Sequence, residues 1–104
     1  MLLFAVSGKA HPGTMEEFAQ KWQDVYRTHF PQMPGFVQAY FSANHEANTW
    51  LAVALWSAQP DETQLRQAIQ ELGGQIASII AGPPFAEWLE VLQQITPAKG
   101  SSSL

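Results

Sequence analysis

The sequence of 104 residues predicts one α+β domain, in which two helices cover one face of a four-stranded antiparallel sheet. Short apolar runs alternate with two longer stretches of helical periodicity, in the order β-α-β-β-α-β. The run WLAVALW, residues 50–56, is apolar on both sides of a strand, because side chains alternate between the two faces. Something must therefore cover each face of the sheet.

The first strand and the first helix are predicted from the start of the chain. Residues 2–8 (LLFAVSG) form a short β-run, and KAHPG turns the chain. Thr14, with Glu17 three residues later, is the pattern of a capping box that begins a helix. Pro31 ends this helix, because the residue before a proline avoids the α conformation. The apolar face of the helix consists of Met15, Phe18, Trp22, Val25 and Tyr26.

The middle of the chain predicts a hairpin and a second helix. Residues 36–42 and 50–56 read as strands joined by ANHEAN, whose Asn and small residues suit a turn. Asp61 and Glu62 favour the start of a helix, where negative charge meets the positive end of the dipole. Gly73-Gly74 is expected to break or bend this helix.

The end of the chain predicts the last strand and a tail. Gly82-Pro83-Pro84 ends the helical region, and residues 85–95 (FAEWLEVLQQI) form the last strand. We expect the domain to span residues 1–95 and residues 96–104 to be a mobile tail without a pattern.

This order of elements is that of the ferredoxin-like folds, in which both helices lie on one face of the sheet. The chain has no further segment to cover the other apolar face. A Trp buries roughly 150–250 Å², so two left in water forfeit several kcal/mol at about 25 cal/mol per Å². We therefore expect a homodimer in which two such sheets pack face to face.

Composition excludes several classes of function. Only 13% of the residues are charged and the net charge is −4, with the five Lys and Arg scattered, so nucleic acid is not an expected partner. The chain has no Cys and therefore no disulfide, thiolate nucleophile or Cys-ligated metal. No basic residue precedes the first apolar run, and no segment approaches the roughly 18 apolar residues of a membrane span. We expect a cytoplasmic protein that does not bind membranes.

Three stretches, KAHPGTMEEF, MPGFVQAYF and NTWLAVALWS, together resemble the antibiotic-biosynthesis monooxygenase (ABM) domain of the dimeric α/β-barrel superfamily. The resemblance covers residues 1–95. It implies a dimeric barrel with a cavity between sheet and helices, where some members oxidise phenols or quinols with O₂ and no metal or flavin. Other members cleave haem, but that branch needs an axial His on the second helix, and none occurs between Asp61 and Phe85.

The resemblance and the helical spacing together mark candidate site residues. Trp56 matches the Trp that closes the third strand in the family and lines the pocket there, although a core role is the alternative. His29 follows Trp22 and Tyr26 on one helical face, so it is a candidate general base near neutral pH. Alternatively, His29 stabilises the C-terminal end of the helix dipole.

Four further side chains are candidates for substrate binding. Tyr26 and Tyr40 carry hydroxyls that could hydrogen-bond a ligand oxygen, and Trp22 faces the expected pocket. Arg66, on the second helix, could balance an anionic substrate. The alternatives are core packing for the aromatic residues and a solvated position for Arg66.

Two hypotheses for the function stay open. The first is a cofactor-independent monooxygenase-like protein acting on a small aromatic, phenolic or quinol compound, with neither a metal nor another cofactor. The second is a non-catalytic dimeric α/β-barrel protein that binds a small apolar ligand. Ala52 and Ala54, on the stripe of Trp56, favour the second hypothesis because they offer no hydrogen-bonding group. The three His residues have no metal-ligand spacing.

Overall fold

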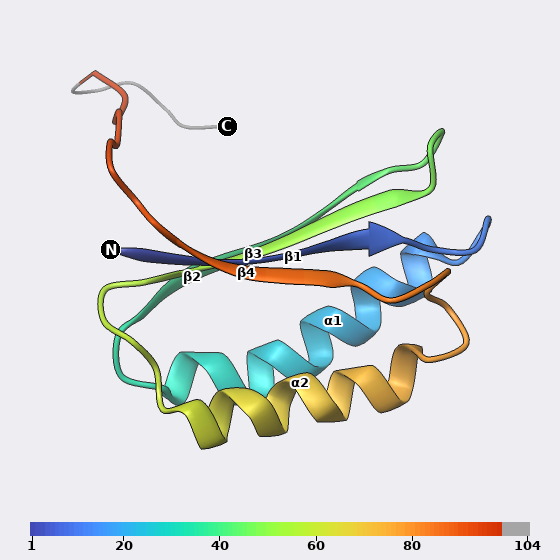
Figure 1. Cartoon of the computed structure of the whole chain (residues 1–104), viewed down its shortest axis with the longest axis horizontal. Coiled ribbons are helices and arrows are strands. Elements are labelled where there is room, and N and C mark those ends of the chain that lie inside the picture. The colour runs from blue at the N-terminus through green and yellow to red at the C-terminus, as the bar shows by residue number, and fades with distance from the viewer. Residues whose placement is uncertain (99–104) are drawn as a thin grey trace.

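The computed structural model describes residues 1–98, and its elements follow the predicted order. The strands form one antiparallel sheet in the order β2-β3-β1-β4, and both helices lie on the same face of it (Figure 1). This confirms the predicted ferredoxin-like fold class. No helix within residues 1–98 is long and apolar enough to cross a membrane. The elements are β1 (Leu2–Lys9), α1 (Met15–His29), the 3₁₀ turn η1 (Phe30–Gln32), β2 (Phe36–Asn44), β3 (Thr49–Trp56), α2 (Glu62–Ile76) and β4 (Phe85–Glu90).

Helix α1 begins where the capping pattern predicts, but the predicted capping bond is absent. Thr14 occupies the N-cap position without a side-chain hydrogen bond to the helix. Its hydroxyl instead donates to the backbone oxygen of His11 at 2.6 Å, which ties the helix start to the preceding turn. At the other end α1 stops at His29, and Pro31 lies in the 3₁₀ turn that follows.

Helix α2 begins at the predicted acidic residues, with Asp61 as its cap, and it is not broken. The Asp61 carboxylate accepts hydrogen bonds from the backbone N–H groups of Thr63 and Gln64 at 2.8 and 3.2 Å. The predicted break at Gly73-Gly74 is wrong, because α2 continues through both glycines to Ile76. Each glycine costs about 1 kcal/mol relative to alanine inside a helix. Burial of an apolar stripe offsets this cost, and the stripe consists of Leu65, Ala68, Leu72 and Ile76.

A bulge in β2 changes the faces that simple alternation predicts. Phe36 pairs with Trp56 and Gln38 pairs with Leu55, so Val37 is an extra residue in the strand. Phe36 and Phe41, which strict alternation assigns to opposite faces, therefore both pack against the core below the sheet. The buried helix-facing side of the sheet includes Phe4, Trp50, Ala52, Ala54 and Trp56.

The opposite side of the sheet, which we call the outer face, is not covered by any element within residues 1–98 (Figure 1). Leu3, Val53 and Leu55 lie in its centre and are half-buried. Towards its edges, Tyr40 is 57% exposed and Phe85 is 61% exposed. The prediction that the helices leave one apolar face bare is confirmed.

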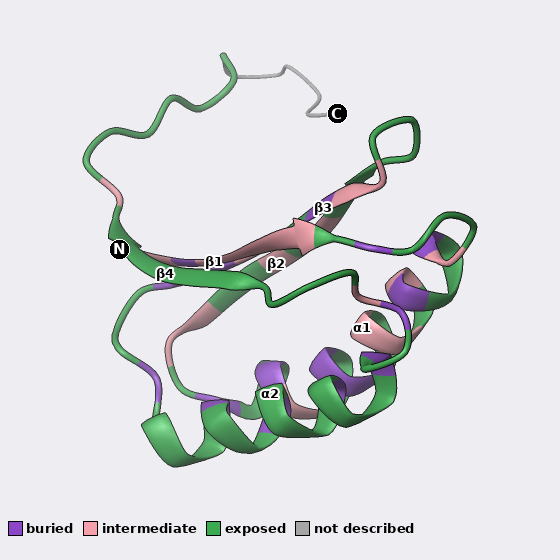
Figure 2. Ribbon diagram, turned by 45° about the vertical axis from the view of Figure 1, so that its right-hand side comes forward, coloured by how far each residue is buried: buried purple, intermediate pink, exposed green. Residues whose placement is uncertain are grey.

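Strand β4 is shorter than predicted. It ends at Glu90, and the backbone N–H of Val91 makes a last hydrogen bond to the oxygen of Met1 at 2.9 Å. The chain then runs away from the sheet rather than across the outer face (Figures 1 and 2). Ile95, predicted to end the strand, is 97% exposed. Residues 99–104, most of the predicted tail, lie outside the described part of the chain.

Candidate functional site

One end of the space between the helices and the sheet is filled by aromatic rings. Trp56 packs edge-on against Phe30 and Phe36, with each pair of ring centroids 5.3 Å apart. Tyr26 stacks on Phe30 with centroids 4.2 Å apart. Trp56 has an exposed fraction of 0%, so no ligand reaches it without displacing its neighbours. We call this region the packed end.

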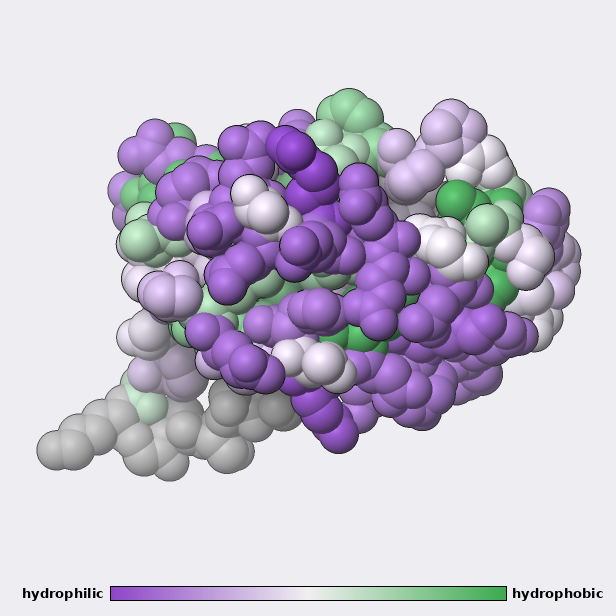
Figure 3. All heavy atoms as spheres, turned by 90° about the horizontal axis from the view of Figure 1, so that it is seen from below, coloured by the Kyte–Doolittle hydropathy of each residue, from purple (hydrophilic) through white to green (hydrophobic). Residues whose placement is uncertain are grey.

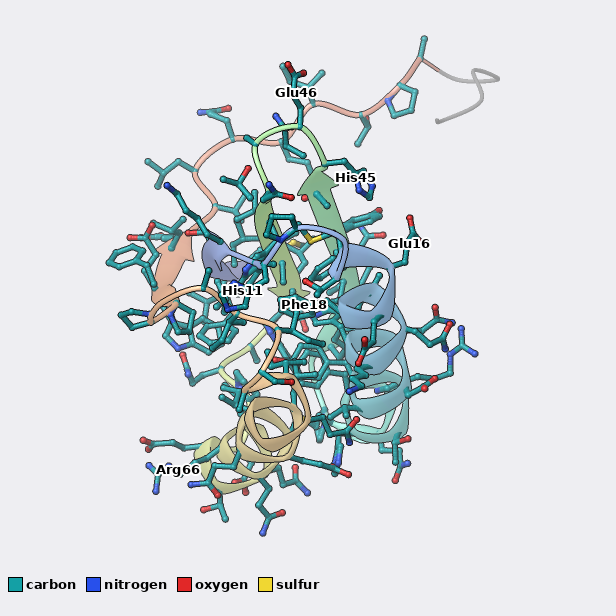
Figure 4. The ribbon with its side chains drawn as sticks, turned by 90° about the vertical axis from the view of Figure 1, so that its right-hand side faces the viewer. His11, Glu16, Phe18, His45, Glu46 and Arg66 are labelled. Atoms are coloured by element: carbon teal, nitrogen blue, oxygen red, sulfur yellow. The ribbon has the colours of Figure 1, made fainter. Side chains whose placement is uncertain are left out.

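The other end contains a cavity of about 170 Å³. Phe18 points from α1 into the interior here (Figure 4), and its ring meets that of Trp50 with centroids 4.8 Å apart. A cavity of about 150 Å³ engineered in another protein binds benzene, so this one suits a single aromatic ring. No charged residue belongs to the lining, which consists of Phe4, Val6, Phe18, Trp22, Tyr26, Trp50, Ala52, Ile69, Leu72, Gly73, Ile76, Ile80, Pro84 and Ala86.

Small residues explain why the second end stays open. Ala52 pairs with Val6 and Phe41 in the sheet and presents only a methyl group to the cavity. Gly8 lies beneath the indole of Trp50, where an added Cβ would stand 3.1 Å from the ring carbon Cζ2. On α2, a Cβ added at Gly73 meets nothing within 4 Å. Larger residues at these positions would shift the Trp50 ring or fill the space.

The cavity lining offers little polar chemistry. Trp22 and Trp50 each bury an indole N–H that has no partner within the described residues. Such a donor costs about 1–3 kcal/mol when it stays unpaired. Burial raises the pKa of the Tyr26 hydroxyl well above its ordinary value, so Tyr26 stays neutral and can donate. The lining is almost entirely apolar, and Tyr26 is its candidate donor to a ligand oxygen.

The structure brings together only two of the predicted site residues. Trp22 and Tyr26 both line the cavity, with ring centroids 5.2 Å apart in an edge-on arrangement. Trp56 lies at the packed end and does not line the cavity. His29 is also outside the lining. Its Nε2 lies 2.5 Å from the Glu71 carboxylate, so its side chain links α1 to α2 near the surface.

Two more predicted residues lie far from the cavity lining. Tyr40 is on the outer face, at the opposite side of the sheet. Arg66 donates to Glu62 at 2.9 Å and points away from the body of the molecule (Figure 4). Within residues 1–98, no three His, Asp or Glu side chains come together in a way that could hold a metal ion.

Several lining residues were not predicted as site residues. The sequence places Phe18 on the apolar face of the first helix and Trp50 in the third strand, and Ala52 favours binding of an apolar ligand over catalysis. The sequence signal for the cavity is Ala52, which lies between Trp50 and Trp56 on one face of β3. Its short side chain leaves space below the sheet. The contributions of Gly73 and Ala86 come from elements whose position relative to β3 the sequence does not reveal.

A second hollow of about 370 Å³ lies between α1 and β2 and is an open surface groove. Trp22 and Tyr26 belong to both its lining and that of the cavity. Seen from the side of the helices, the surface is mainly hydrophilic, and hydrophobic residues appear in breaks between the hydrophilic ones and at the margins (Figure 3).

No protein-family model and no curated protein matches the sequence. Solved structures match over almost the whole chain. The monooxygenase from the ActVA-Orf6 gene of Streptomyces coelicolor, in complex with nanaomycin D, is 20% identical, with 93% of this chain and 92% of that chain covered and a TM-score of 0.72. SnoaB of Streptomyces nogalater, named a cofactor-independent oxygenase, is 16% identical, with 92% and 97% covered and a TM-score of 0.67. A protein named antibiotic biosynthesis monooxygenase is 10% identical, with 89% and 100% covered and a TM-score of 0.66.

Proposed function

Since the chain has the fold of the antibiotic-biosynthesis monooxygenases, we propose that it is a cofactor-independent monooxygenase of a small phenolic or quinol compound. The observation that carries this proposal is the uncharged cavity of about 170 Å³ between the sheet and the helices, with the neutral Tyr26 in its lining. Its volume suits one aromatic ring. The Tyr26 hydroxyl suits the oxygen of a phenol or a quinol.

In the proposed reaction the substrate supplies all the electrons. One hydroquinone and one O₂ give one hydroxylated quinone and one water, so one oxygen atom enters the ring and the other leaves with two hydrogens. The ring loses four electrons, which is the number that O₂ accepts. An ionised quinol is electron-rich enough to reduce O₂ itself. The protein then has to favour the anion, hold the ring and exclude water.

The cavity residues divide these tasks. The Tyr26 hydroxyl would donate to the substrate oxygen and stabilise its developing negative charge. The rings of Phe18 and Trp50, which contact each other, would pack against the substrate ring and exclude water. With no charged residue in the lining, we assign no base inside the cavity: the substrate proton would leave to water, and the Tyr26 hydroxyl would stabilise the anion. A role for His29 as the base remains a prediction from the sequence.

The proposal is tested with 2-methylhydroquinone in an oxygen electrode. We expect O₂ consumption above the background without protein, and ¹⁸O₂ should place one labelled atom in the product. Tyr26→Phe should slow the reaction, whereas Tyr40→Phe, on the outer face, should not. Consumption at the background rate for a panel of single-ring hydroquinones and phenols would refute the enzymatic function.

The alternative is a dimeric barrel that binds a small apolar ligand without reaction. The specific observation in its favour is again the lining, which has no charged group to move a proton. Mass spectrometry of the denatured protein would identify a co-purified ligand. A bound aromatic compound together with background O₂ consumption would favour this alternative.

We also propose that the chain acts as a homodimer through its outer face. Leu3, Val53 and Leu55 make the centre of this face apolar, and a second copy presents the same surface in a self-complementary way. Sedimentation equilibrium should give a dimer at micromolar concentration. Val53→Glu should give a monomer, while Gln67→Glu adds the same charge on the exposed side of α2 and should leave the dimer intact. A wild-type monomer would refute this assembly.

A further inference from the structure

We propose that the ligand enters the cavity between α2 and β4, across the bare backbone of Gly73. This inference rests on the proposed function, since it concerns the same cavity. It adds an entry route and a residue that controls access.

The burial of the lining residues separates the floor of the cavity from its rim. Floor residues such as Phe18 and Trp50 are buried between the helices and the sheet. The exposed lining residues all come from α2 or from the segment that leads into and starts β4. They are Ile69, Gly73, Pro84 and Ala86. The cavity therefore opens to solvent on this side.

Gly73 is the smallest residue at the rim. It lies inside α2 with ordinary helical geometry, so its backbone does not require glycine. No neighbouring atom requires it either, because an added Cβ meets nothing within 4 Å. Alanine here would favour the helix by about 1 kcal/mol. What glycine provides is space at the rim, and a side chain at position 73 would occupy it.

The groove between α1 and β2 is the competing route, and two packed rings obstruct it. Trp22 and Tyr26 separate this groove from the cavity, with ring centroids 5.2 Å apart. Tyr26 is buried and also stacks on Phe30, with centroids 4.2 Å apart. A ligand that enters from this side has to displace both rings. A ligand that enters across Gly73 meets no side chain there, because glycine has none.

The test compares Gly73→Leu with Gly74→Leu. Both glycines are helical and neither Cβ would meet an atom within 4 Å, but only Gly73 lines the cavity. The probe is 4-fluorophenol, followed by ¹⁹F NMR exchange so that binding is measured without turnover. Gly73→Leu should slow association and dissociation by about tenfold each, because a plug at the rim acts on both rates. Gly74→Leu should stay within about twofold of the wild type.

A smaller variant controls for folding. Gly73→Ala should keep the fold and slow exchange less than Gly73→Leu does. Equal rates for Gly73→Leu and Gly74→Leu, or a wild type that does not bind the probe, would overturn the proposal. So would Val37→Trp, in the competing groove, if it slowed exchange more than Gly73→Leu. A dissociation constant that rises for Gly73→Leu at an unchanged association rate would also overturn it, since that result means a filled cavity.

Failure of this inference is distinguishable from failure of the proposed function. Probe binding that depends on position 73, together with background O₂ consumption, would refute the enzyme and keep the entry route. O₂ consumption by the wild type, together with equal exchange in the two leucine variants, would keep the enzyme and refute the entry route.

Discussion

Trp50 and Trp56 lie on the same face of the same strand, yet one borders a cavity and the other is packed on all sides. Their neighbours make the difference. Trp56 meets the rings of Phe30 and Phe36, which fill the packed end. Trp50 contacts Phe18 and Phe41, but it also lies over Gly8 and near Ala52, where the side chain is missing or short. An aromatic residue on a strand is therefore not by itself a sign of a binding site, and small residues around it are more informative.

The largest expected effect comes from removing the ring at the packed end. Trp56→Ala should lower the free energy of unfolding by about 3–5 kcal/mol, because the surrounding rings cannot collapse into the space. That is a large part of the usual margin of about 5–15 kcal/mol. Urea unfolding followed by circular dichroism measures it.

Trp50→Ala is the matched substitution at the cavity end. It should cost less than Trp56→Ala, because it enlarges a cavity that already opens to solvent, but it should abolish binding of 4-fluorophenol. A larger loss of stability for Trp50→Ala than for Trp56→Ala would contradict the distinction between the two ends.

The next effect concerns alkaline pH and Tyr26. Because burial raises the pKa of Tyr26 in the folded chain, the unfolded chain loses this proton first as the pH rises above about 10. The folded chain therefore keeps its full free energy of unfolding below that pH. Above it, this free energy falls by at most about 1.4 kcal/mol per pH unit. Unfolding curves between pH 9 and 11 should show that Tyr26→Phe reduces the loss, while Tyr40→Phe keeps it. Equal curves for both variants would count against a buried Tyr26 hydroxyl.

A smaller change is expected at the second helical glycine. Gly74→Ala should raise the free energy of unfolding by about 0.5–1 kcal/mol, since it favours the helix and touches nothing. Ligand exchange should not change, because Gly74 does not line the cavity. Thermal melting measures the gain, and a loss of stability would mean that α2 does bend at this position.

The smallest effect is expected at His29, beside the packed end. His29→Ala removes a partly exposed pair with Glu71, which should cost less than about 1 kcal/mol. A double-mutant cycle with Glu71→Ala isolates the pair. O₂ consumption should be unchanged, because His29 does not line the cavity. A large fall in kcat without a change in KM would instead restore His29 as the general base.

The sequence predicts the fold better than the site. The order of elements, the Asp61 cap and the bare outer face follow from local patterns and are all found. The bulge at Val37 and the unbroken helix through Gly73-Gly74 do not, because packing against distant segments decides both. The bulge shifts the register of β2, and this shift places Phe36 on the helix-facing side of the sheet.

For the candidate site, the sequence predicts only lining residues that share one helix face. Trp22 and Tyr26 follow from the spacing on α1, and both line the cavity. His29 follows the same spacing but lies where the end of α1 meets α2, so its partner is Glu71. Apart from Phe18 on α1, the remaining lining comes from α2, three strands and the connection to β4, and no periodicity within one segment could bring these residues together.

The placement of the tryptophans also makes the chain its own optical reporter. Trp22 and Trp50 border the cavity, Trp56 is enclosed, and Trp88 is 36% exposed on β4 beside Phe4. Their emission should therefore differ in wavelength, with Trp88 the most red-shifted. An aromatic guest should quench Trp22 and Trp50 while Trp56 keeps its intensity, so occupancy and unfolding can be read from separate bands of one unlabelled sample.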